Sequence, residues 1–302
     1  MFGITFAELT DLVLYHPDVT AYEVKDVDGS LVGLFLVDFF MRPSKREGAW
    51  MSEFRGQSNL DEPIRPIVTN CCNFSKGEPC LLGLDEVRTL FHELGHGLHG
   101  LLSQVRYRSQ SGTSVKSDFV ELPSQIFEHW AVEPSVLRNY AKHHETGEPI
   151  PEALIEKLLA SDTFNQGFAT TEYLAASYLD MAWFELESPT DLSVSDFERR
   201  AMAAIDLIEF VAPRYHSTYF QHVFATDGYS AGYYAYLWAE VLDADGFEAF
   251  KENGIFDPET ASAFRRNILE KGGSADPMAL YHAFRGRAPS QTALLRNRGL
   301  DG

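Results

Sequence analysis

The sequence predicts a mainly α-helical fold with a small β-sheet near the N-terminal end of the chain. Alternation of apolar and polar residues, rich in β-branched and aromatic types, is confined to about residues 20–74. After residue 85, apolar residues recur with helical spacing almost to the end. No repeat or linker divides the 302 residues, so we expect a single domain, 1–302, with a β-containing part (1–84) and a helical part (85–302).

The β-containing part is expected to begin with a hairpin. Residues 20–40 form two alternating runs with Asp28–Gly29 between them, and an Asp-Gly pair in that position favours a tight turn. Residues 41–63 are polar and interrupted by glycine and proline, so they predict a loop. The stretch PIVTNCCNF (66–74) predicts a further short strand.

The helical part contains a series of segments with helical periodicity, several of which begin with residues that favour helix N-termini. Pro123 is tolerated only in the first turns of a helix, so the second helix must begin just before it. The predicted helices span residues 85–103, 119–132, 134–145, 151–160, 163–187, 195–209, 213–224, 229–243, 245–253, 257–269 and 276–284.

Composition and charge exclude several classes of protein. Hydrophobic residues make up 45% of the chain, which is too many for a disordered protein. The net charge of −19 disfavours nucleic acid as a partner, because phosphate binding requires clustered lysine and arginine. No apolar run approaches the roughly 20 residues that span a membrane, and the N-terminus lacks the pattern of a signal peptide. The three cysteines have neither disulfide nor CxxC spacing, so we expect a cytoplasmic protein.

The stretch FHELGHGLHG (91–100) has the spacing of a zinc site. His92 and His96 lie one helical turn apart and can both reach one zinc ion. Glu93 lies to one side, where it can act as general base for a metal-bound water. On a helical wheel the histidines, including His99, lie opposite the apolar arc, which argues against a core role; for His99 a packing role is favoured over one that supports a ligand.

Two glycines in the same helix support this interpretation. Gly95 and Gly97 each destabilise a helix by about 1 kcal/mol relative to alanine, so some structural feature should compensate. Close approach of another helix or of the metal site is the expected reason.

A catalytic zinc ion needs a third protein ligand and one open position. The segment DFVELPSQIFEHWA (118–131) places Glu121, Gln125 and Glu128 on one helical face. One glutamate is therefore expected to be the third ligand and the other to hold a histidine ring. A capping box with Asp118 is the alternative for Glu121 but does not account for Glu128. The spacing leaves open which glutamate binds the metal.

A third group of candidate site residues lies in the last quarter of the chain. Tyr229, Tyr233 and Tyr236 follow the spacing i, i+4, i+7 and would share one helical face. Such a stripe is by itself more typical of a core than of a binding site.

Several long motifs resemble the thimet oligopeptidase family of zinc peptidases, which includes oligopeptidase A and bacterial peptidyl-dipeptidase (dipeptidyl carboxypeptidase). The resemblance covers nearly the whole chain. The EHWA variant and the terminal FRGRAP…RGL pattern are most similar to the peptidyl-dipeptidase branch. The motifs are GAWMSEFRGQ (48–57), PIVTNCCNF (66–74), FHELGHGLHGLLSQVRYRSQSGTSV (91–115), DFVELPSQIFEHWA (118–131), GYSAGYYAYLWAEVL (228–242) and LYHAFRGRAPSQTALLRNRGL (280–300).

The resemblance implies a zincin-type catalytic domain that binds one Zn²⁺ per chain. By position, His92, His96 and Glu121 correspond to the family's zinc ligands and Glu93 to its catalytic base. Glu128 then remains as the carboxylate that holds a histidine ring.

The resemblance also gives roles to the tyrosines. Tyr233 and His222 correspond to residues that stabilise the oxyanion, and Tyr229 and Tyr236 to residues that bind the substrate. This chain departs from the family at HVFATDGY (222–229), which has one glycine where the family loop has several.

The implied activity is zinc-dependent hydrolysis of short peptides with release of C-terminal dipeptides. Two alternatives stay open: an endopeptidase of the oligopeptidase A type, and a zinc-binding but inactive fragment. Family members are roughly twice as long, and their N-terminal half forms the other wall of the substrate channel. The chain is therefore expected to be a fragment or to associate with a second chain. The strand at 66–74 is expected to hydrogen-bond an extended peptide.

Overall fold

The β-containing part forms one five-stranded sheet with the order β1-β2-β3-β5-β4. The computed structural model describes residues 1–301. Neighbouring strands are antiparallel, apart from the parallel pair β3–β5. The strands are β1 (Thr5–Glu8), β2 (Thr20–Lys25), β3 (Leu31–Phe40), β4 (Trp50–Arg55) and β5 (Ile67–Phe74).

The predicted hairpin is confirmed, and two strands were missed. β2 and β3 are joined through the expected turn, where Gly29 has φ +81°. The loop predicted over 41–63 is wrong in its middle, because β4 pairs there with β5. β5 has hydrogen-bonded neighbours on both sides, so the prediction that it binds a peptide along its edge is wrong. Within residues 1–301 the sheet ends at β1 on one side and at β4 on the other.

The rest of the chain is mainly helical, as predicted. The helices are α1 (Leu84–Leu102), α2 (Leu122–Val132), α3 (Pro134–Tyr140), α4 (Glu152–Ser161), α5 (Gln166–Phe184), α6 (Val194–Ala204), α7 (Gln221–Phe224), α8 (Ala235–Asn253), α9 (Pro258–Phe264), α10 (Pro277–Arg285) and α11 (Thr292–Asn297). A π-helical turn (Arg265–Leu269) follows α9. None of these helices is long and apolar enough to cross a membrane.

Three helix predictions need correction. The helices expected at 229–243 and 245–253 are one helix, α8, which begins only at Ala235. The helix expected at 213–224 is reduced to a 3₁₀ turn and the short α7. α2 begins at Leu122 rather than at residue 119, because residues 118–121 form turns.

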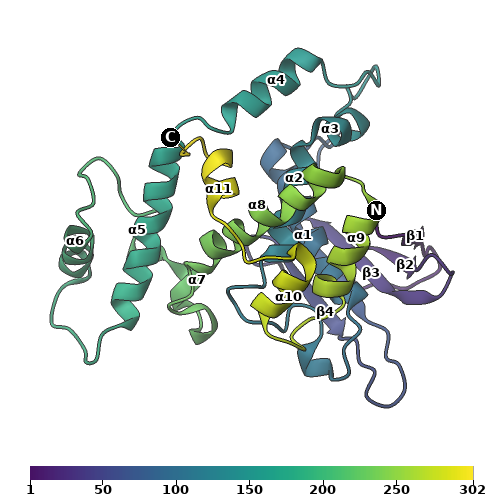
Figure 1. Ribbon diagram of the computed structural model, residues 1–302, viewed down its shortest axis with the longest axis horizontal. Coiled ribbons are helices and arrows are strands. Elements are labelled where there is room, and N and C mark those ends of the chain that lie inside the picture. Colours follow the sequence, from purple (N-terminus) through teal and green to yellow (C-terminus); the bar gives the residue numbers. More distant parts are fainter. Residues whose placement is uncertain (302) are drawn as a thin grey trace.

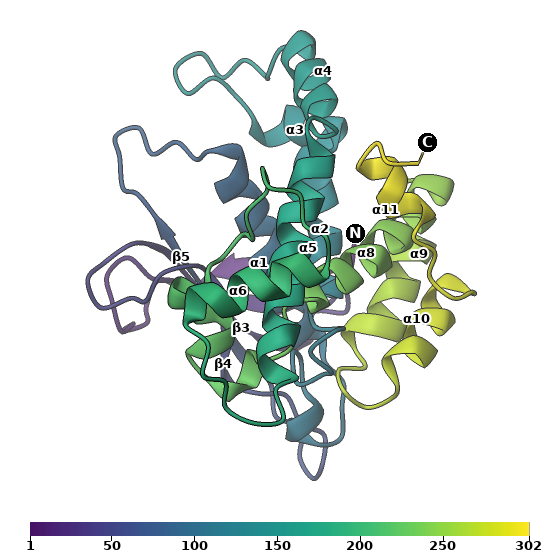
Figure 2. The same ribbon diagram turned by 90° about the vertical axis from the view of Figure 1, so that its left-hand side faces the viewer.

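The sheet and three of the helices form successive layers around one core. α1 packs against β3, β4 and β5, α2 packs on α1, and α8 packs on α2. The core joins these layers through side chains such as Val68 of β5, Leu98 of α1, Ile126 of α2 and Leu242 of α8. Figure 1 shows α5 and α6 at the opposite end of the molecule from β1 and β2, and Figure 2 shows the same two helices facing the viewer. The α1–α2 pair therefore lies between the sheet and the α5–α7 region.

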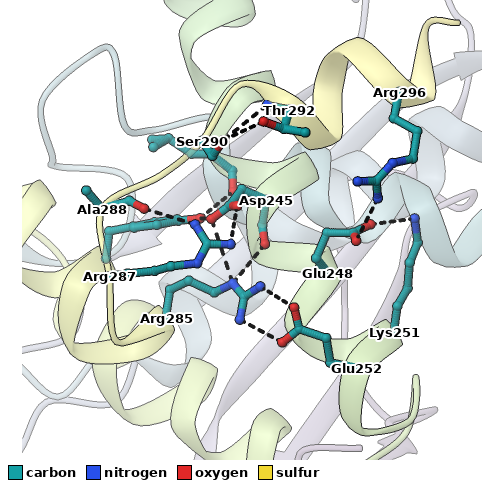
Figure 3. Close-up of polar contacts among 12 residues, drawn as sticks. Asp245, Glu248, Lys251, Glu252, Arg285, Arg287, Ala288, Ser290, Thr292 and Arg296 are labelled. Carbon is teal, nitrogen blue, oxygen red and sulfur yellow. Dashed lines mark hydrogen bonds and ion pairs between the residues drawn. The ribbon is translucent and has the colours of Figure 1, made fainter. Parts of the chain in front are cut away.

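Residues 277–298, which we call the C-terminal strap, run along α8. Arginines of the strap pair with acidic residues of α8, and Figure 3 shows Arg285 and Arg287 converging on Asp245. The pairs are Arg285 with Glu252, Arg287 with Asp245, Arg296 with Glu248 and Arg298 with Glu240. Asp245 is 2% exposed and also accepts a 2.6 Å hydrogen bond from Tyr281 Oη. Among the α8 acids that pair with the strap, Asp245 is the most buried.

We expect Asp245→Asn to lower the free energy of unfolding by about 2 kcal/mol, the size of a buried hydrogen bond to a charged group. The new amide would place its NH₂ group against either the Tyr281 or the Arg287 donor, because the two donate to different oxygens of Asp245. Urea denaturation measures the change. Glu259→Gln is the control, because Glu259 is exposed and forms no ion pair within residues 1–301. Equal midpoints for Asp245→Asn and the parent protein would contradict a stabilising role of the strap.

Candidate metal centre

Gly95 sets the distance between the two helices that carry the candidate ligands. A Cβ at this position would lie 2.2 Å from Pro123 O and 2.7 Å from Ser124 Cα, both on α2. Gly97 faces the sheet instead, where a Cβ would lie 3.1 Å from the Phe35 ring. The cost of glycine in a helix is therefore explained by a close contact with α2 at Gly95 and by a close contact with the sheet at Gly97. The first of these contacts brings the start of α2 over the histidines of α1.

His92, His96 and Glu121 form a group able to hold a metal ion, with one ligand atom of each within 4.8 Å of the others. The Nε2 atoms of both histidines lie 3.2 Å from Glu121 Oε2. Ligand atoms about 2.0–2.1 Å from a tetrahedral zinc ion lie about 3.3 Å from one another. The two measured spacings thus fit a zinc ion bound between the three side chains.

The charges of the group favour a cation at this position. Burial acts against the charged form of Glu121, but hydrogen bonds with His92 and His96 hold its pKa well below the usual range. Burial also disfavours protonated His92, yet hydrogen bonds with Glu121 and Glu128 raise its pKa to about 10. Both effects show that the two carboxylates stabilise positive charge between them.

Glu121 does not form the capping box that was the alternative explanation for it. It occupies the N-cap position of α2, but its side chain accepts no capping hydrogen bond. Its Oε2 atom instead faces the histidines and accepts a 2.6 Å hydrogen bond from Ser124 Oγ. The sequence analysis did not predict a role for Ser124. Its position three residues after Glu121, which places a hydroxyl near that side chain, was the available indication.

Glu128 lies two turns further along α2 and contacts the other side of one ring. Its Oε1 atom is 2.7 Å from His92 Nδ1, so the ring can present Nε2 to the metal position. The structure thus places Glu121 against the two Nε2 atoms and Glu128 against Nδ1.

We expect Glu128→Gln to weaken zinc binding about 10- to 100-fold, as is typical when the partner of a ligating histidine is changed. The change removes the charge that supports His92 while keeping the size of the side chain. Competition with a chromophoric chelator measures the affinity. Glu156→Gln on α4 is the control, since Glu156 is exposed and carries the same charge. Unchanged affinity in Glu128→Gln would show that Glu128 does not support the ligand.

Glu93 is a buried carboxylate beside this group. It is 4% exposed, and its Oε2 atom has no hydrogen-bond partner among the described residues. Burial raises its pKa, while the charges of His92 and His96 act in the opposite direction. A carboxylate with a raised pKa and a free oxygen is suited to accept a proton and return it.

The helical wheel placed the histidines of α1 away from the core, but this face of the helix is buried. His96 is 8% exposed and His99 is fully buried, because α2 packs on this side of α1. Burial lowers the pKa of His99 to about 3, and neither of its nitrogens has a hydrogen-bond partner in the described chain. His99 is not part of the metal-binding group.

The tyrosines come together with His222, but not on one helical face. Tyr229 and Tyr233 precede α8, and only Tyr236 lies on it. Their ring centroids lie 4.8, 5.5 and 5.6 Å from that of His222, for Tyr229, Tyr233 and Tyr236 respectively. Tyr229 is exposed, whereas Tyr233 is buried in an apolar cluster with Tyr173 and Phe220.

This tyrosine cluster lies beside the start of α2. Gln125 Nε2 donates a 3.2 Å hydrogen bond to Tyr236 O. Burial lowers the pKa of His222, while the Glu121 carboxylate acts to raise it. Burial raises the pKa of both Tyr233 and Tyr236, with Glu121 adding to the effect at Tyr236. Phenols are protonated at neutral pH even at their ordinary pKa of about 10, so both can donate hydrogen bonds.

A further pair, half-buried His129 and buried Asp243, joins α2 to α8. His129 Nε2 lies 2.7 Å from Asp243 Oδ1, and its ring stacks on Phe247 at 4.6 Å. Burial raises the pKa of Asp243 to about 7. Sequence reasoning missed this pair, although His129 belongs to the EHWA motif.

The sequence profile of Peptidase family M3 matches residues 1–300. The chain belongs to this family. The resemblance inferred from the motifs is thereby confirmed, and the fold class, mainly α with a small sheet, agrees with the structure.

Similar peptidases from bacteria support the assignment to family M3. The chain is 49% identical over its whole length to dipeptidyl carboxypeptidase of Salmonella typhimurium and 46% identical to that of Escherichia coli. Oligopeptidase A of Escherichia coli is 40% identical, also over the whole chain. In each case the match covers 45% of the relative, so this M3 chain spans about half the length of these proteins.

Proposed function

We propose that this chain is the catalytic part of a zinc peptidase that releases dipeptides from the C-termini of short peptides. The observation that carries the proposal is the group of His92, His96 and Glu121, with the buried carboxylate of Glu93 beside it. Dipeptide release is favoured over internal cleavage because the identity to dipeptidyl carboxypeptidases (49% and 46%) exceeds that to oligopeptidase A (40%).

His92, His96 and Glu121 would hold the zinc ion. When bound, zinc lowers the pKa of a coordinated water towards neutrality and polarises the carbonyl of the scissile peptide bond. Glu93 accepts the proton of the attacking water and then delivers it to the leaving amine. Glu128 holds the His92 ring in the orientation that binding requires.

The tyrosine cluster would act on the substrate. Tyr233 and His222 are proposed to donate hydrogen bonds to the oxyanion that develops on the scissile carbonyl, and Tyr229 and Tyr236 to bind the peptide. Burial raises the pKa of Tyr233 and Tyr236, so both phenols keep the proton that such hydrogen bonds need.

An extended peptide would bind along β4 rather than β5. β4 is the last strand of the sheet and packs against α1, which carries both histidines. Backbone hydrogen bonds along a sheet edge hold a peptide with little dependence on its side chains, which suits a peptidase that acts on varied sequences.

The peptide channel is proposed to be completed by a polypeptide equivalent to the part of the relatives that this chain does not match, either an N-terminal half of the same protein or a second chain. Apolar side chains around α4–α7 support this, since Phe164, Ile208 and Phe210 are 81%, 62% and 88% exposed. Surfaces of this kind are typical of interfaces.

We place the protein in the cytoplasm. Cys71, Cys72 and Cys80 are free within the described residues, as is usual in a reducing compartment.

Two measurements on the purified chain test the proposal. Metal analysis should find one zinc ion per chain, and mass spectrometry should find a dipeptide released from a peptide with a free C-terminus but not from its amidated form. A chelator should stop the reaction and added zinc restore it. Internal cleavage of both peptides would favour the oligopeptidase alternative. Stoichiometric zinc without any chelator-sensitive cleavage would identify an inactive zinc-binding fragment.

A further inference from the structure

The loop that leads into α8 is held by a buried carboxylate from α5. Asp180 is fully buried, and each of its carboxylate oxygens accepts a hydrogen bond from the loop backbone. Ala231 N donates to Oδ1 at 3.0 Å, and Tyr233 N donates to Oδ2 at 2.9 Å. Hydrogen bonds to an ionised carboxylate are stronger than those between neutral groups.

The backbone between these two donors has an unfavourable conformation. Ala231 has φ +55°, in the left-handed region that costs an L-residue with a side chain roughly 1–2 kcal/mol. This turn ends the 3₁₀ segment that contains Tyr229 and directs the chain into α8. A turn of this kind needs contacts that hold it in place, and Asp180 supplies two of them.

α5 also holds the carbonyl side of Tyr233. Tyr173, two turns before Asp180, donates its hydroxyl proton to Tyr233 O and accepts a 3.3 Å hydrogen bond from Leu237 N. The Tyr173 and Tyr233 rings stack with centroids 5.1 Å apart. α5 thus contacts Tyr233 at three points: its N–H, its carbonyl oxygen and its ring.

No ion pair among the described residues explains the carboxylate at position 180. No cation forms an ion pair with Asp180 within residues 1–301, and burial raises its pKa. A buried carboxylate without a cation is costly. An apolar side chain would avoid that penalty but would leave the two loop N–H groups without an acceptor, so these N–H groups are what the carboxylate serves.

We propose that Asp180 is a positioning residue, which fixes the turn at Ala231 so that Tyr229 and Tyr233 gather with Tyr236 around His222. This inference rests on the proposed function for its effect on catalysis. Asp180 acts through the backbone of the loop and belongs to a helix that carries none of the metal-binding residues.

The test compares Asp180→Asn with Asp38→Asn. Asp38 is also fully buried, but it pairs with Arg42 and Lys45 at the end of β3 and contacts no residue of the loop. In Asp180→Asn the amide NH₂ opposes one of the two loop donors. We expect kcat to fall about 10- to 100-fold, the size of one or two charge-assisted hydrogen bonds, with zinc content unchanged. Asp38→Asn should lower the melting temperature and leave kcat unchanged.

Amide hydrogen exchange supplies a readout that needs no activity. In the parent protein the Ala231 and Tyr233 amides should exchange as slowly as interior amides of α5, and in Asp180→Asn they should exchange at least about 10-fold faster. Fast exchange of both amides in the parent protein would overturn the inference, even if Asp180→Asn fails to fold. A folded, zinc-loaded Asp180→Asn protein with the parent kcat would also overturn the inference. If the parent protein cleaves no peptide, the proposed function fails, and the exchange result still decides whether Asp180 holds the loop.

Discussion

Replacing Glu93 with glutamine should lower kcat/KM for peptide hydrolysis about 1,000-fold, within the 10²–10⁴ range of general base catalysis, while zinc stays bound. The side chain is 4% exposed, and its Oε2 atom has no partner among the described residues, so a glutamine fits the same space. An amide cannot accept the proton of the attacking water. Initial rates on a peptide with a free C-terminus, together with the zinc content of each sample, measure the effect.

Glu86→Gln is the matched control for this experiment. Glu86 lies on the same helix and accepts a hydrogen bond from Gly83 N at 2.7 Å, which a glutamine can also accept. The Glu86→Gln protein should keep both the parent rate of hydrolysis and the parent zinc content. A Glu93→Gln protein that retains more than a tenth of the parent rate would rule out Glu93 as the base. Loss of zinc in that variant would instead show that Glu93 helps to hold the metal.

The part of the candidate site that lies on α1 could be predicted from sequence because it depends on helical geometry alone. His92 and His96 are one turn apart whatever surrounds the helix. The choice between Glu121 and Glu128 was different, because both lie on one face of the helix predicted over 119–132. It depends on how closely α2 approaches α1 at Gly95, and this distance is a property of the packed helices.

The failures in the fold predictions have the same origin. β4 (WMSEFR) is half-exposed and lacks strict alternation of apolar and polar residues, and it forms a strand because β5 pairs with it. The tyrosine spacing predicted a helix from residue 229, but the positive φ of Ala231 delays the start of α8. That turn is held by Asp180, which lies 51 residues earlier in the sequence. Local patterns do not contain contacts over such distances.

Replacing Gly95 with alanine should be among the most damaging changes in the chain. The added Cβ would lie 2.2 Å from Pro123 O and 2.7 Å from Ser124 Cα, and both of these are backbone atoms that cannot turn aside. α2 must therefore move away from α1. We expect a loss of about 3 kcal/mol in the free energy of unfolding, at the upper end for overpacking. We also expect zinc affinity to fall by more than 100-fold, because Glu121 would move away from the two Nε2 atoms.

Gly167→Ala separates this effect from the general effect of alanine in a helix. Gly167 lies in α5, and a Cβ there would meet nothing within 4 Å. Alanine should therefore stabilise the protein by about 0.5–1 kcal/mol. Urea denaturation and chelator competition on both variants measure stability and zinc affinity separately. If Gly95→Ala loses stability but keeps its zinc affinity, α2 shifts without displacing Glu121, and the close contact at Gly95 serves packing alone. A fall in both quantities would show that the metal centre depends on the close approach of α1 and α2 at Gly95.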